Sequence, residues 1–167
     1  MNVEEYTNSI FNIIISTYKV EEDRTDSAIH LRYIYTQALY GYEEFGKKYI
    51  SEKAKNVYKS LGLPGKLSQW QGREQRKFKS KGKRHGIFHL DHIYTISMFK
   101  RALKNQNEQL TAKTINKLVS ENYAVAWILS DENKLLDGRG YKANRGETLE
   151  DALDVYSKLG IKLIRVV

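Results

Sequence analysis

Residues 123–137 of this 167-residue chain, YAVAWILSDENKLLD, place two kinds of secondary structure in direct succession. The first seven residues are almost wholly apolar and include valine, tryptophan and isoleucine, which predicts a buried strand. Ser130 or Asp131 is a good N-cap for a helix that follows at once, and Gly138 and Gly140 end it. A strand that leads directly into a helix indicates a domain with both elements.

Helical spacing dominates the rest of the chain. The pattern predicts helices over 3–19, from Thr25 or Asp26 to Leu39, over 43–61, over 97–104, after Thr111, and from Glu147 to Leu159. Alternation predicts short strands over 87–93 and 161–167. We therefore expect a mostly helical α+β fold. It divides into a helical region (1–65), a basic connecting segment (66–84) and a second domain (85–167) that closes with a helix–strand unit.

The positive charge is concentrated in the connecting segment. The chain has 28 Lys or Arg against 20 Asp or Glu, a net charge of +8, and residues 66–84 hold eight of the basic residues but only one acid, Glu74. Such a segment favours an anionic partner, either nucleic acid or a membrane surface. Trp70 and Phe78 could stack on bases. The expected phosphate contacts are Arg73, Arg76, Lys77, Lys79, Lys81, Lys83 and Arg84.

Composition also limits the cellular setting. The chain has no cysteine, which excludes disulfides and thiolate metal sites. No apolar run is long enough to span a membrane, and the N-terminal residues lack the basic start of a secretory signal. The basic run has no apolar face that would bind a membrane surface. These features predict a cytoplasmic protein without a membrane partner.

A histidine cluster follows the basic segment. Three of the four histidines fall within residues 85–92, and Asp91 directly precedes His92. Imidazole exchanges protons near neutral pH, and carboxylates bind hard cations. On a strand, His89 would lie on the same side as Asp91, as a further phosphate contact or a supporting residue. The cluster therefore indicates chemistry on a polyanion.

The order of these motifs resembles the HNH (ββα-metal, His-Me finger) endonuclease family. A strand ends in Asp91-His92, a second strand follows Asn122, and a closing helix carries Asn133 and Asp137. The resemblance implies a small nuclease core in which His92 activates water and Asn122 orients the loop around it. Asp91, Asn133 and Asp137 would hold one divalent cation.

The details of this resemblance set the expected cofactor and substrate. Asn133 stands where the family commonly has a histidine, and about thirty residues separate His92 from Asn122. Oxygen ligands favour Mg²⁺ or Mn²⁺ over Zn²⁺. The resemblance thus implies a metal-dependent hydrolase that cuts phosphodiester bonds, with DNA favoured over RNA as the substrate.

Two other functions fit the same residues. One is a non-enzymatic nucleic-acid-binding protein that uses the basic segment alone. The other is an interaction module whose tyrosine-rich N-terminal helices bind a protein partner. The sequence also leaves open a homodimer, which would suit a nuclease that cuts both strands.

Overall fold

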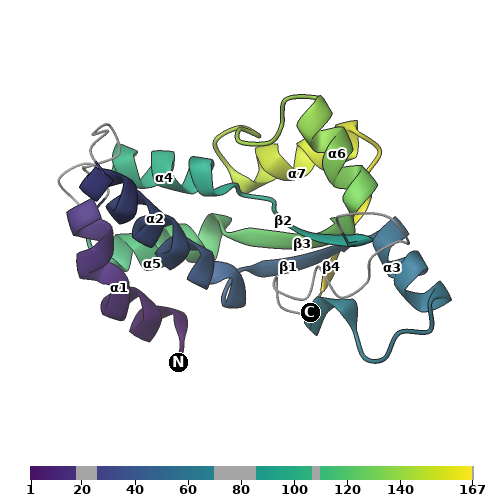
Figure 1. The fold of residues 1–167 in the computed structure, drawn as a ribbon, viewed down its shortest axis with the longest axis horizontal. Coiled ribbons are helices and arrows are strands. Elements are labelled where there is room, and N and C mark those ends of the chain that lie inside the picture. The colour runs from purple at the N-terminus through teal and green to yellow at the C-terminus, as the bar shows by residue number, and fades with distance from the viewer. Residues whose placement is uncertain (18–25, 70–85, 107–109, 167) are drawn as a thin grey trace.

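The computed structural model describes residues 1–17, 26–69, 86–106 and 110–166, and it has the expected mostly helical α+β class (Figure 1). Its α-helices are α1 (Val3–Thr17), α2 (Asp26–Tyr40), α3 (Glu52–Ser60), α4 (Ile96–Asn105), α5 (Ala112–Asn122), α6 (Ser130–Gly138) and α7 (Leu149–Lys158). Two 3-10 turns, η2 (Gly41–Glu44) and η3 (Leu67–Gln69), flank β1 and α3 in the sequence.

A mixed sheet forms the centre of the molecule. Its strands are β1 (Lys47–Ser51), β2 (Phe88–His92), β3 (Ala124–Leu129) and β4 (Leu163–Val166). They lie in the order β2-β3-β1-β4, with β1 parallel to β3 and the two outer strands antiparallel to their neighbours. The apolar run predicted as a strand is therefore an inner strand, and all but its last residue are buried.

The helices are arranged around this sheet in groups (Figure 1). Helices α6 and α7 lie together over one side of it, whereas α1, α2, α4 and α5 gather at the end where β2 finishes and β1 and β3 begin. Helix α3 lies at the opposite end. Aromatic rings fill the joint between the helical group and the sheet, where Tyr42 and Tyr123 both contact the ring of Phe99.

The helix predicted over 43–61 is wrong in its first half. Residues 47–51 form β1, and only residues 52–60 are helical. Tyr49 and Ile50 favour a strand although the lysines do not, and pairing with β3 on one side and β4 on the other satisfies the backbone groups of this stretch. Ser51 then caps α3 by accepting a hydrogen bond from the backbone N–H of Ala54.

Other predicted boundaries agree closely with the structure. Thr111 caps α5, and Gly160, at φ 68°, follows the last turn of α7. The predicted cap of α6 is wrong, because the N-cap is Leu129 and its backbone N–H donates to the carboxylate of Glu132. Among the described helices, none combines the length and apolar composition needed to cross a bilayer.

The division into residues 1–65, 66–84 and 85–167 stays a prediction. The sheet draws on both the first and the last of these segments, because β1 pairs with β3 and β4 on its two sides. The strand–strand–helix order expected after residue 85 is present as β2, β3 and α6, with β2 and β3 antiparallel. An additional strand, β1, therefore packs beside this unit.

Candidate functional site

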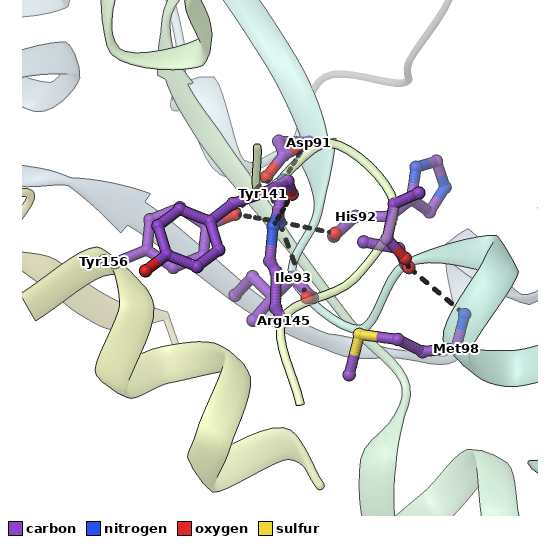
Figure 2. Close-up of polar contacts among 9 residues, drawn as sticks. Asp91, His92, Ile93, Met98, Tyr141, Arg145 and Tyr156 are labelled. Atoms are coloured by element: carbon purple, nitrogen blue, oxygen red, sulfur yellow. Dashed lines mark hydrogen bonds and ion pairs between the residues drawn. The ribbon is translucent and has the colours of Figure 1, made fainter. Parts of the chain in front are cut away.

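Strand β2 carries Asp91 and His92 on opposite sides of the sheet. Successive side chains of a strand alternate between faces, so neighbours in sequence have different surroundings. Asp91 is buried and lies toward the loop after α6 and toward α7. Figure 2 shows the imidazole of His92 pointing away from Asp91 and Arg145. The two residues that the sequence placed in one site are thus separated by the strand itself.

The Asp91 carboxylate is held by a buried ion pair. Arg145, which is 3% exposed, donates from Nη1 to Asp91 Oδ2 at 2.6 Å and from Nη2 to Oδ1 at 3.2 Å. The hydroxyl of Tyr156 also donates to Oδ2. Arg145 Nη1 reaches the carbonyl of His92 at 2.8 Å, and Nε reaches that of Tyr141 at 2.8 Å (Figure 2). The guanidinium therefore joins β2, α7 and the loop between α6 and α7.

The electrostatics of this cluster follow from burial and charge pairing. Burial lowers the pKa of Arg145 and is the largest single effect, but the charge and hydrogen bond of Asp91 together with Tyr156 and Asp137 outweigh it, so the net pKa lies above its ordinary value. Burial and the nearby Asp91 charge raise the pKa of Tyr156 well above 10.0. The cluster is therefore a charged pair with a neutral phenol, and both carboxylate oxygens of Asp91 are already bonded.

His92 has a different environment near η2. Its Nε2 lies 3.0 Å from Oε1 of Glu43, and the two side chains are 17% and 27% exposed. The Nε2 atom is itself buried and makes no well-aligned hydrogen bond to any described residue. The rings of Tyr40 and Tyr123 contact the imidazole at centroid distances of 5.0 and 6.1 Å. A half-buried histidine beside a carboxylate is an arrangement that can accept and return a proton.

The other expected site residues, Asn122 and the two cation ligands of α6, are dispersed over different elements. Asn122 is the last residue of α5, where its side chain contacts the carbonyl of Leu118 at 3.5 Å. Asn133 and Asp137 lie four residues apart on α6, and the charge of Asp137 acts on His89 and Arg145. Within the described ranges, no three histidine or carboxylate side chains come together as a metal ion would require.

The residues therefore do not fit the divalent cation that the resemblance implies. Asp91 would have to give up its bonds to Arg145 and Tyr156 before it could bind a metal. The Mg²⁺ or Mn²⁺ cofactor stays a prediction that this arrangement of side chains does not support.

The remaining predicted contacts lie partly outside the described residues. Arg73, Arg76, Lys77, Lys79, Lys81, Lys83 and Arg84 all fall within residues 70–85. His89 is described, half-buried on the same face as Asp91, and burial lowers its pKa below 6.5 although the Asp91 charge opposes this. His89 is thus disposed to be neutral, which weakens its expected role as a phosphate contact.

A second buried carboxylate lies at the far end of the sheet. Glu132, 5% exposed, accepts from the hydroxyl of Ser51 at 2.6 Å and from the backbone of Leu129 at 2.9 Å. It connects the first turns of α3 and α6, where helix dipoles favour negative charge. Its other oxygen, Oε1, has no hydrogen-bond partner among the described residues. No local spacing in the sequence links Glu132 with Ser51, which lies 81 residues away.

Comparisons with family models, with curated proteins and with solved structures found no match to this chain. The likeness to HNH endonucleases therefore remains a resemblance of motifs.

Sequence reasoning missed three partners of the Asp91-His92 pair. The sequence pattern linked neither Arg145, Tyr156 nor Glu43 with Asp91 or His92. Arg145 lies 54 residues from Asp91 and Tyr156 lies 65 residues away, so no local spacing could connect them. The one available signal was a basic residue in the loop that precedes a well-capped helix, which is weak.

Proposed function

We propose that this protein binds nucleic acid. The observation that carries the proposal is the concentration of charge in residues 66–84, which hold eight basic residues against one acid. A surface of this kind attracts phosphate backbones, and counterion release makes the binding depend on salt. We propose DNA rather than RNA as the partner.

The attachment of this segment to the sheet supports the proposal. On the N-terminal side, Leu67 of η3 is buried in the core. On the C-terminal side, Ser130 makes two hydrogen bonds to the residues that follow the segment. Its hydroxyl donates to the carbonyl of Gly86, and its backbone N–H donates to the carbonyl of Ile87 at 2.9 Å. The described residues on both sides of the basic segment are therefore fixed to the folded body.

A second candidate function is hydrolysis of the bound phosphodiester, and the His92–Glu43 pair favours it. In this reaction His92 accepts a proton from water, the water oxygen bonds to phosphorus, and the ester P–O bond breaks. The leaving oxygen then takes a proton from solvent. Glu43 would orient the imidazole and stabilise its charged form, as a carboxylate does for histidine bases. No step in this account uses Asp91, which is occupied by Arg145.

Binding and cleavage can be tested together. Purified protein is titrated into a labelled 20-nucleotide DNA at several salt concentrations, and we expect affinity to fall as salt rises. Affinity that is absent, or independent of salt, would contradict the binding proposal. Supercoiled plasmid and single-stranded DNA are then incubated with Mg²⁺, Mn²⁺ or EDTA.

The catalytic role of His92 has a matched control. If His92 is the general base, His92→Ala should slow cutting by about 10²- to 10⁴-fold without weakening DNA binding. His30→Ala, which changes an exposed histidine of α2, should leave cutting unchanged. Cutting that survives in His92→Ala would remove the histidine from the mechanism. Binding without cutting under any condition would leave the non-enzymatic function.

A further inference from the structure

A basic pocket opens where the first residues of β1 meet the end of β4 and the turn η3. Its volume is about 330 Å³, and four of its lining residues are the cations Lys47, Lys48, Lys66 and Arg165. Among the described residues, the lining has no acidic side chain. Lys66 is the first residue of the basic segment, so the pocket includes the start of that segment.

Most of these cations have no counter-charge. Lys47 donates to the backbone carbonyl of Glu121. Within the described part of the chain, Lys48, Lys66 and Arg165 have no ion pair. Like charges gathered in one concave site repel each other unless an anion joins them. The fold nevertheless brings them to one pocket. Lys48 is paired with Val166, and Arg165 precedes Val166 on β4, so the two cations reach the pocket from opposite faces of this strand pair.

The other lining residues indicate which anion would fit. Ser68 and Gln69 offer neutral hydrogen-bond donors, and none of the described lining residues is aromatic. Gly46 also lines the pocket and lies against Tyr123. A Cβ added to Gly46 would lie only 2.7 Å from the tyrosine ring. Without a stacking surface the pocket has little to hold a base, whereas cations and hydroxyl or amide donors match a phosphate.

We propose that this pocket binds a phosphate group of a nucleic-acid strand, with Lys48, Lys66 and Arg165 supplying charge and Ser68 and Gln69 supplying hydrogen bonds. This inference rests on the proposed nucleic-acid binding and names its anchoring site. Lys48 and His92 are both paired with Val125 across β3, so their backbones lie about 10 Å apart. A strand held in the pocket would therefore lie near the His92–Glu43 pair.

The test compares two double variants of equal charge. Lys48→Gln/Arg165→Gln changes the pocket, and Lys53→Gln/Lys59→Gln removes two exposed lysines of α3. Binding of a labelled single-stranded DNA is measured by fluorescence anisotropy over a range of salt concentrations. NMR then follows the amide signals of Gly46 and Ser68 during titration with inorganic phosphate and with a nucleoside monophosphate. Thermal unfolding checks that both double variants fold. Lys66→Gln is a second pocket variant whose residue lies outside the sheet.

If the proposal is correct, the pocket variant weakens DNA binding about tenfold or more, and the slope of log affinity against log salt falls by about 0.7 for each lost phosphate contact. The α3 variant changes affinity less than about twofold. Equal losses in both variants would overturn the pocket while leaving nucleic-acid binding intact.

Two further outcomes separate the pocket from the proposed function. In the first, phosphate shifts the signals of Gly46 and Ser68, the shifts vanish in the pocket variant, and no DNA binds. This outcome would support a pocket that binds a free phosphate compound and would overturn nucleic-acid binding. The absence of both DNA binding and phosphate shifts would overturn both proposals.

Discussion

Asp91 and His92 are consecutive residues of β2, yet their surroundings differ in almost every respect. Asp91 is buried, bonded through both oxygens to Arg145 and bonded again to Tyr156. His92 is partly exposed and has one carboxylate neighbour, Glu43, at 3.0 Å. A polar group whose bonding capacity is filled by the protein stabilises the fold, whereas one with unused capacity can act on a ligand. Asp91 therefore has a structural role, and His92 is the residue of the two for which we propose a chemical one.

The strongest challenge to this comparison is to remove Arg145. Arg145→Ala would leave the Asp91 carboxylate buried without a counter-charge, which costs about 3–5 kcal/mol of unfolding free energy. Urea unfolding followed by circular dichroism measures this loss. Arg139→Ala, at an exposed position in the same loop, should change stability by less than about 0.5 kcal/mol.

The His92 side supplies a counterpart to that variant. Glu43→Gln breaks a partly exposed pair and should cost less than about 1 kcal/mol. If Arg145→Ala cost no more than Glu43→Gln, the two sides of β2 would be equivalent and the distinction between them would fail.

A smaller change sharpens the account of the Asp91 cluster. Tyr156→Phe removes only the hydroxyl that donates to Asp91 and keeps the ring that lies against Arg145 at 5.2 Å. We expect a loss of about 1–3 kcal/mol, because a buried carboxylate oxygen loses one of its donors. Tyr33→Phe, at a residue 64% exposed on α2, is the control and should be neutral in the same unfolding assay.

The smallest expected effect is a pH dependence at His89, on the same face as Asp91. Burial holds the pKa of His89 below 6.5 in the folded protein, although the Asp91 charge opposes this shift. The unfolded chain therefore binds the proton more tightly, and stability is lost as pH falls below 6.5 toward the folded pKa. His89→Gln should flatten the dependence of unfolding free energy on pH in that window. An unchanged slope would show that other groups control it.

The helices and strands were largely accessible from local pattern. Thr111 and the apolar run before Ser130 mark boundaries through bonds within a few residues, and these predictions were confirmed. The helix predicted over residues 47–51 was wrong because those backbone groups find their partners in β3 and β4, more than seventy residues away in sequence.

The candidate site could be predicted only in part, for the same reason. The sequence identified Asp91 and His92 as polar residues at a strand end. It could not indicate that a single strand separates them, nor that Arg145 and Tyr156 fill the bonding capacity of one while Glu43 approaches the other. The cations of the basic pocket come from β1, β4 and the residues around η3, so their proximity has no sequence signature.

The sequence by itself determined the fold class, most element boundaries and the excess of positive charge, because propensity, capping and composition act over a few residues. Only the tertiary structure decided which polar groups are satisfied and which remain open, because this depends on contacts between segments far apart in the chain. The packing of α7 over β2 makes Asp91 part of a buried ion pair. The pairing of β1 with β4 makes Lys48 part of a pocket whose described lining has no acidic residue. Neither outcome can be predicted from the residues next to Asp91 or Lys48.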